Sequence, residues 1–477
     1  MTLGRPPRLR RPRPRIPVLG FGVAAVAFVS GVALARVGTM AGGAGPLLML
    51  VLPVGLLAAA AIMSRPALGI VAVFLSFPVG FVALPIGALD IRLVEAAAAF
   101  AVGLIALRRM SAGTSPLPWA PQMWWAAGLV AMALLSTPGA LDMSFALKQD
   151  GLLVVGFLLA LAAPAALRST GEVRGAVGVL LVVGTGIAAY GFRGVSHLHA
   201  DFGGTVVTNR AQGLFAQPNE LGAFSAAMIM LAIGVLFGAR SRWARAGAAV
   251  ALAVDLVALA LSLSRGAWMG TAFGAFVLLA VLPQARRALL SVGLPVLIGT
   301  AILLAVLLPA SPLPAQVQVV KERIGTLAHP TVAVNPYDLR PKIWHTAELL
   351  IEQHPLTGIG AGNFPVASTQ DNRLPEPIDH AHNVLLTVAT EVGIPGALAL
   401  IGFTIALGLL AWKVVRAFGD PRDRAILAGV IAALATQIGH GLVDFILRNP
   451  VLFILMWALA GIILAGGRLL EDEEPAP

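Results

Sequence analysis

The sequences DLRPKIW (residues 338–344), HPLTGIG (residues 354–360) and DHAHN (residues 379–383) lie in one polar interval, residues 309–383. The rest of the 477-residue chain is strongly apolar, since 58% of all residues are hydrophobic and only 12% are charged. A soluble protein of this length could not bury so much apolar surface, so the composition predicts an all-α, polytopic membrane protein. Five of the eight histidines lie between His329 and His382, which makes this interval the first candidate for chemistry.

Apolar segments long enough to cross the hydrocarbon layer as helices recur along the chain. We predict a single membrane domain over residues 1–477, a transmembrane helical bundle of about 12–14 spans of roughly 17–24 residues each. The pair of segments between residues 67 and 107 is the least regular, because Pro78, Pro85 and Asp90 interrupt it. The predicted spans are residues 16–35, 46–63, 67–86, 91–107, 119–136, 150–167, 175–192, 220–239, 246–264, 267–283, 288–308, 384–411, 425–443 and 450–467.

The distribution of positive charge predicts the orientation. The net charge of +10 is compatible with nucleic-acid binding, but the cations lie in short links between apolar segments, as membrane orientation requires, so no nucleic-acid partner is expected. With both termini in the cytoplasm, residues 193–219 and residues 309–383 become outer loops. The chain has no cysteine, which excludes disulfides and thiol catalysis. The cations of the predicted inner links are Arg65, Arg108, Arg109, Arg168, Arg174, Arg240, Arg242, Arg245, Arg286, Arg287, Lys413, Arg416, Arg422 and Arg424.

The large outer loop is expected to contain an amphipathic helix. Asp338 can cap it, and Pro341 suits its first turn. Apolar residues recur at helical spacing from Ile343 to Ile351 and define one face. His354 precedes a proline, so the helix should end there.

Three arginines are candidates for binding a diphosphate at the outer face: Arg210, Arg265 and Arg340. An arginine at a membrane boundary is costly and usually has a partner or a task. A guanidinium group is planar, always charged and able to grip phosphate oxygens in pairs. The alternatives are snorkelling to the interface for Arg265 and ordinary loop salt bridges for Arg210 and Arg340.

His382 is the candidate catalytic residue, because a helix amino terminus disfavours the imidazolium and leaves a neutral ring that can accept a proton. The alternative is a boundary histidine satisfied by Asp379 or by a backbone carbonyl. His380, on the same extended segment, is expected to point elsewhere.

Other polar residues lie in or near the predicted spans. Asp255 falls within a predicted span, where an ion path and a paired structural role are both open. His440 and Asp444 share one helix face, as a metal or proton pair or a buried hydrogen bond. No zinc-type cluster is visible, so we expect no metal site.

At this point the chain resembles the O-antigen ligase and polymerase superfamily of bacterial membrane glycosyltransferases. The family signature of His, Asn, nine residues and Gly-x-x-Gly stands here as His382-Asn383 followed by Gly393-Ile394-Pro395-Gly396. A second signature, Arg-x-x-x-Leu, stands as residues 210–214. The stretches around Arg265 and Arg340 also look like the family's. Asn383, Trp344 and His380 are further candidate site residues in these stretches.

The resemblance implies an inverting, metal-independent transfer of glycan from an undecaprenyl-diphosphate donor to an acceptor hydroxyl, with no cofactor. The acceptor would be lipid A core, another glycan or a protein side chain, so ligase and polymerase both remain open. The protein would lie in the bacterial cytoplasmic (inner) membrane as a multi-pass enzyme with its active site outward. A transporter or lipid-linked sugar flippase would be expected to show paired repeats and a charged midplane site. A membrane scaffold would not need grouped outer arginines.

Overall fold

The structure is a computed structural model that describes residues 45–86, 89–193, 195, 199–201, 206–293, 339–371, 374 and 378–473. The chain forms two units, Met1–Arg65 and Pro66–Pro477. In the first unit the described element is α2 (Gly45–Ser64), which corresponds to a predicted span. The span predicted at residues 16–35 and most of that at residues 288–308 lie outside the described residues.

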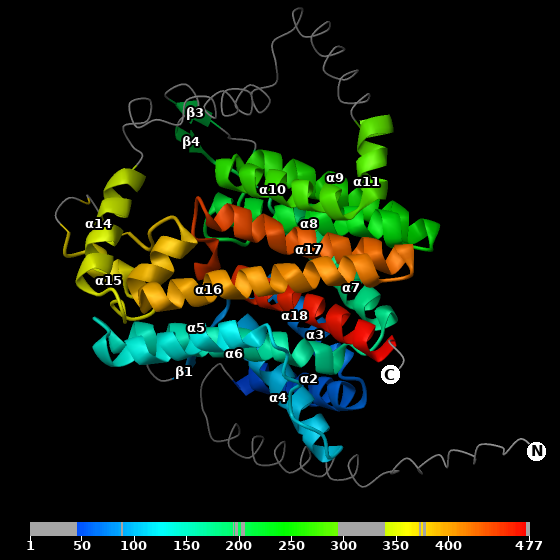
Figure 1. The fold of residues 1–477 in the computed structure, drawn as a ribbon, viewed down its shortest axis with the longest axis horizontal. Coiled ribbons are helices and arrows are strands. Elements are labelled where there is room, and N and C mark those ends of the chain that lie inside the picture. Colours follow the sequence, from blue (N-terminus) through cyan, green and yellow to red (C-terminus); the bar gives the residue numbers. More distant parts are fainter. Residues whose placement is uncertain are drawn as a thin grey trace, which may run out of the picture. The chain divides into compact units, whose positions relative to one another are not determined.

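The second unit is a helical bundle with two short hairpins (Figure 1). The hairpins pair antiparallel, β1 (Ala83–Ile86) with β2 (Leu89–Arg92) and β3 (His199–Asp201) with β4 (Val206–Thr208). The bundle and the segments around it are formed by α3 (Ala67–Leu75), α4 (Leu93–Ser111), α5 (Met123–Ser136), α6 (Met143–Ala166), α7 (Thr170–Tyr190), α8 (Pro218–Gly238), α9 (Arg242–Ser262), α10 (Arg265–Val281), α11 (Pro283–Ala288), α14 (Arg340–Gln353), α15 (Phe364–Ser368), α16 (Val384–Ala417), α17 (Pro421–Gly441) and α18 (Pro450–Glu473).

The all-α, polytopic fold predicted from the sequence is confirmed. Six described helices are long and apolar enough to cross a membrane: α6, α7, α8, α9, α16 and α18. A seventh crossing would require α10 and the segment after it, which are bent by 107° and could also form a re-entrant loop.

The predicted span at residues 67–86 differs from the structure. It is a short helix, α3, followed by a single 3-10 turn at Phe77–Val79 and by strand β1. Pro78 lies in that turn and Pro85 in the strand, and a proline cannot donate the hydrogen bond that a continuing helix needs. The remaining predicted spans within the described residues correspond to helices, although α11 and the turn after it reach only the start of residues 288–308.

Glycines allow the central helices to approach one another closely. Helix α17 packs against both α8 and α10. A Cβ added to Gly234 of α8 would lie 2.9 Å from the Cα of Gly429 of α17, and one added to Gly270 of α10 would lie 2.5 Å from the carbonyl oxygen of Thr436. Small residues permit such packing where the hydrophobic effect does not drive helices together. Helix α17 is therefore fixed from two sides.

The helix ends form two opposite groups. At one end, α16 begins and the short links α9–α10 and α17–α18 lie; Figure 1 shows α14 and α15 at this end. We call it the His382 end. At the opposite end, Arg240 of the α8–α9 link lies 3.1 Å from Asp420 of the α16–α17 link, and Arg174 pairs with Asp423. The arginine-rich links therefore gather away from His382.

The amphipathic helix predicted in the large loop is confirmed as α14. Ile343 and Ala347 are buried in a cluster with Phe364 and Ala381, and α14 ends before His354 as expected. The predicted cap, Asp338, lies outside the described residues.

The turn after α14 docks into a break in α16. Gly358 and Gly360 have φ of 66° and 97°, and Gly393 inside α16 has φ of 85°, a left-handed region that favours glycine. The Gly360 N–H donates to the Glu391 carbonyl oxygen at 3.0 Å, and the Ile394 N–H donates to the Pro355 carbonyl oxygen at 2.8 Å. The break thus exposes backbone groups that the turn satisfies.

Candidate active site

His382 lies immediately before α16 and is held there by its neighbour. The Asn383 side chain caps the helix, since its Oδ1 accepts from the N–H groups of Leu385 and Leu386 at 2.9 and 3.1 Å. Its Nδ2 donates to the Leu442 carbonyl oxygen at 2.9 Å. Asn383 therefore ties the start of α16 to the end of α17, and His382 adopts a φ of 50° in the turn.

The imidazole of His382 is paired with a buried carboxylate. Its Nδ1 lies 2.8 Å from Oδ1 of Asp444, whose side chain is 5% exposed. Burial alone would raise the pKa of Asp444, but the contacts with His382 and His440 outweigh it and hold the pKa well below its usual range. Because an ionised carboxylate only accepts hydrogen bonds, it favours the tautomer of His382 with hydrogen on Nδ1 over the one with hydrogen on Nε2. The lone pair on Nε2 is then available for a proton.

Arg210 is joined to this pair through an asparagine. Its Nε donates to the Ser262 carbonyl oxygen at 2.6 Å and its Nη2 to Oδ1 of Asn219 at 2.8 Å. The amide nitrogen of Asn219 donates to Oδ2 of Asp444 at 2.9 Å. The structure thus connects Arg210, Asn219, Asp444 and His382 in one chain of hydrogen bonds.

Arg265 is the first residue of α10, and the residue after it packs against His440. Leu263, with φ of 52°, makes a sharp turn between α9 and α10, and Ser264 caps α10 through the N–H of Ala267 at 3.2 Å. A Cβ on Gly266 would lie 2.8 Å from Nε2 of His440, which itself lies 3.9 Å from Oδ2 of Asp444. Asp444 is thus surrounded by His382 at 2.8 Å, the Asn219 amide at 2.9 Å and, at the longer distance, His440.

Arg340 is the first residue of α14, which packs on α16. It lies one helical turn before Trp344, whose indole N–H donates to the Ala381 carbonyl oxygen at 2.9 Å. Residues four apart share a helix face, so Arg340 lies on the face that contacts the His382 segment. The packing of α14 on α16 links Arg340 to the His382 segment.

The expectation that His380 points elsewhere is wrong. Its ring packs edge-on against that of His382, with centroids 4.4 Å apart, and its Nδ1 accepts from the His382 N–H at 3.2 Å. Burial, followed by the nearby His382, lowers the pKa of His380 to about 4. The ring is therefore neutral near pH 7 and supports His382 by packing. An extended segment would separate the two rings, but the left-handed φ of His382 folds them together.

A polar cavity of about 440 Å³ opens beside these residues. Asn219, His380 and Asp444 line it, together with Glu220 and Arg448. Arg448 donates to the Asp379 carbonyl oxygen. Sequence reasoning missed Asn219 and Arg448; the signal for Arg448 was the polar link between two apolar segments.

Three of these residues could also hold a metal ion. His380, His382 and Asp444 can each offer one ligand atom, and the three atoms lie within 4.8 Å of one another. The sequence did not indicate this group because Asp444 lies 62 residues beyond His382.

Comparison with known protein families adds an independent observation. Residues 248–401 match the O-Antigen ligase family. The resemblance indicated by the motifs is therefore confirmed. The O-antigen ligase match contains Arg265, Arg340 and His382, whereas Arg210, Asn219 and Asp444 lie outside it. The site thus combines the matched region with α8 and the link after α17.

Other comparisons are less informative. A comparison with curated proteins finds no match. One solved structure, described as a peptidoglycan synthase complex in which polymerization and crosslinking are coordinated, is similar at 19% identity with a TM-score of 0.43. The similarity covers 75% of this chain and 99% of that one. At that TM-score it carries no argument about function.

Proposed function

We propose that this protein transfers a glycan from a polyprenyl-diphosphate donor, such as undecaprenyl diphosphate, to an acceptor hydroxyl. The observation that carries the proposal is the pairing of His382 with the buried Asp444, which is connected to Arg210 through Asn219. The O-antigen ligase match over residues 248–401 supports glycan transfer as the general class of reaction. The acceptor can be lipid A core, another glycan or a protein hydroxyl, since ligase and polymerase use the same chemistry.

The proposed reaction is a single displacement with inversion. The acceptor oxygen attacks the anomeric carbon while its proton passes to Nε2 of His382. The bond from the anomeric carbon to the diphosphate oxygen breaks, and the lipid diphosphate leaves with the bonding electrons. Asp444 stabilises the imidazolium that forms, because its charge faces the other ring nitrogen at 2.8 Å.

The arginines would neutralise the charge that develops on the leaving diphosphate. Arg210 is suited to this role because the Ser262 carbonyl and Asn219 hold its guanidinium in one orientation. Arg265 and Arg340 each begin a helix, and both lie at the His382 end of the bundle. Guanidinium groups bind phosphate oxygens in pairs, so several arginines at one end of the bundle suit a ligand with two phosphate groups.

An apolar cavity of about 170 Å³ between α16, α17 and α18 would hold part of the polyprenyl tail. It begins at Val384, two residues after His382, and is lined by Ile401, Ile438 and Met456. Leu442, which lines it, also accepts the Asn383 hydrogen bond. This apolar cavity therefore starts beside the position where the diphosphate would bind.

We also propose on which side of the membrane the active site lies. The arginine-rich ends lie away from His382, which favours the cytoplasm for those ends and the outer side of the inner membrane for the active site.

Asp255 of α9 accepts a hydrogen bond from the Thr185 hydroxyl of α7 at 3.3 Å, which is consistent with a structural pairing of neighbouring helices.

The decisive experiment measures the initial rate of glycan transfer by purified protein in liposomes, with donor binding followed separately. If His382 is the base, His382→Ala should bind donor normally and turn over about 10²–10⁴-fold more slowly. Arg340→Lys retains the charge but not the two-pronged grip, so it should weaken donor binding or turnover strongly. Wild-type rates for both variants would refute the site.

Adding a chelator to the same assay tests the alternative that His380, His382 and Asp444 bind a catalytic metal ion. Transfer should continue unchanged in excess chelator, because the proposed base needs no ion. Activity that is lost and then restored by a divalent cation would instead assign these three residues to a metal.

A further inference from the structure

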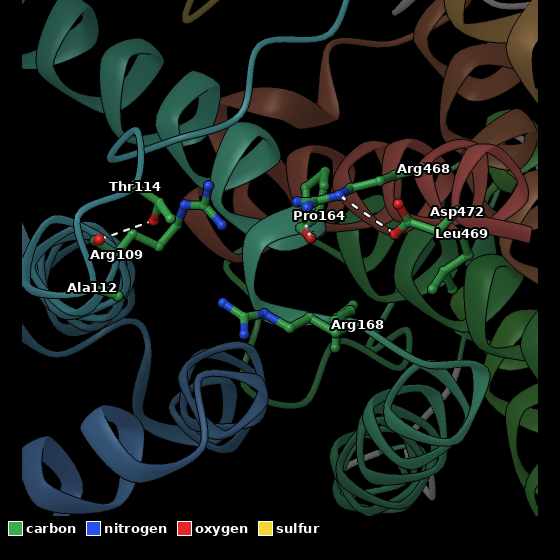
Figure 2. Close-up of a pocket in the computed structure, with 9 residues that line it drawn as sticks. Arg109, Ala112, Thr114, Pro164, Arg168, Arg468, Leu469 and Asp472 are labelled. Carbon is green, nitrogen blue, oxygen red and sulfur yellow. Dashed lines mark hydrogen bonds and ion pairs between the residues drawn. The ribbon is translucent and has the colours of Figure 1, made fainter. Parts of the chain in front are cut away.

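A second cationic cavity lies at the end of the bundle opposite His382. It has a volume of about 340 Å³ and is lined by Arg109 of α4, Arg168 of the α6–α7 link and Arg468 of α18 (Figure 2). Apolar residues, including Leu167 and Leu469, complete the wall. Figure 2 shows the three guanidinium groups directed toward the same space. The glycan-transfer reaction proposed above uses none of these residues.

The three side chains are held in place by backbone oxygens. The Nε of Arg109 donates to the Ser115 carbonyl at 2.7 Å, and that of Arg168 donates to the Ala165 carbonyl at 3.0 Å. The Nη1 of Arg468 donates to the carbonyl of Pro164 at 3.2 Å. Each guanidinium group has further N–H donors, so these bonds orient the groups without exhausting them.

Positive charge exceeds negative charge in the wall. Asp472 is the one carboxylate among the described residues that line the cavity, and it lies 3.9 Å from Arg468 on the exposed side of α18. Burial, followed by the charges of Arg468 and Arg168, lowers the pKa of Arg109, which lies at the polar end of α4. Grouping like charges is unfavourable unless an anion binds between them.

The two cavities lie at opposite ends of the same helices. Arg92, directly before α4, lines the cavity beside His380, and Arg109 near the end of α4 lines this one. Their separation of 17 positions corresponds to roughly 26 Å along a helix, close to the thickness of the hydrocarbon layer at about 30 Å. Helix α18 repeats the pattern, with Pro450 at one cavity and Arg468 at the other.

We propose that Arg109, Arg168 and Arg468 form a binding site for a phosphate group at the membrane face opposite the active site. Phosphate oxygens match the paired donors of arginine. Basic pockets between helices at the cytoplasmic face bind anionic lipid headgroups, and the apolar wall here suits the start of an acyl chain. The same chemistry would also accept a phosphate from a soluble ligand.

The test uses full-length protein in nanodiscs of phosphatidylcholine, with phosphatidylglycerol or inorganic phosphate added. Thermal stability and native mass spectrometry report binding. The variants are Arg168→Gln and Arg468→Gln, and the matched control is Arg245→Gln, an exposed arginine at the start of α9 that does not line the cavity. Since the Arg168 side chain is exposed, its replacement should leave the fold intact even if Arg468→Gln disturbs α6.

Phosphatidylglycerol should bind the unchanged protein and the control about tenfold or more tightly than it binds the two variants. That result would identify a lipid headgroup as the ligand. If inorganic phosphate raises the melting temperature of the unchanged protein and of the control but not of the two variants, the site holds a soluble phosphate. Equal lipid binding by all four proteins, with no effect of phosphate, would overturn the proposal.

Discussion

At the residue scale, the candidate base His382 could be predicted from the sequence, but its carboxylate partner could not. His382 was marked by the residues that follow it, Asn383 and Gly393. Asp444 was paired in the sequence with His440 by its spacing of four, whereas the structure pairs it with His382 at 2.8 Å. Asp444 lies 62 residues beyond His382 and meets it only because α16 and α17 pack together. A local sequence pattern cannot predict that packing.

Gly393 gives the family signature a physical meaning. Asn383 starts α16, and Gly393 breaks it so that the turn at residues 355–360 can dock. Gly393→Ala should destabilise the protein by about 1–3 kcal/mol from backbone strain alone. A Cβ there would also lie 2.3 Å from the Leu356 carbonyl oxygen. Thermal unfolding of the purified variant measures the loss.

The matched control for that substitution is Gly408→Ala in the same helix. A Cβ on Gly408 meets nothing within 4 Å, and alanine favours a helix over glycine, so stability should stay constant or rise slightly. If both variants unfold at the same temperature, the break at Gly393 is not required by the fold.

At the element scale, hydrophobic length and periodicity predicted most helices, because apolar segments in a membrane must satisfy their backbone internally. Helix α14 was recognised from its apolar face and from the proline after His354. The prediction failed at residues 67–86, where composition is apolar but Pro78 and Pro85 divert the chain into a turn and a hairpin. Segment length and hydropathy alone cannot predict that turn and hairpin.

The apolar cavity between α16, α17 and α18 yields a prediction at this scale. Ile438→Trp should fill the cavity and impair use of a long-chain donor, while a donor with a shortened prenyl tail should be affected less. Transfer rates with the two donors measure the difference. Leu409→Trp is the control, since Leu409 is 68% exposed on α16 and does not line the apolar cavity. Equal losses with both donors would place the tail elsewhere.

At the scale of the whole molecule, the charge pattern and the fold support one another. The links that the sequence assigned to one side by their arginines gather at one end of the bundle, where Arg240 meets Asp420 and Arg174 meets Asp423. The active-site candidates gather at the other. Sequence could predict this division because lysine and arginine concentrate in the links on one side of a membrane protein. It could not predict the cavity formed by Arg109, Arg168 and Arg468, because that cavity requires the ends of α4 and α18 to meet the α6–α7 link.

The orientation can be tested directly because the chain has no native cysteine. Leu356→Cys places a thiol at a position that is 68% exposed near the His382 end, and Gly419→Cys places one in the α16–α17 link, where a Cβ meets nothing within 4 Å. In intact cells, a membrane-impermeant maleimide should label the first variant, and it should label the second only after the membrane is permeabilised. Denatured samples of both variants control for reactivity. The opposite pattern would put His382 in the cytoplasm, where a lipid-linked glycan displayed on the outer leaflet could not reach it, and the proposed reaction would then fail together with the orientation.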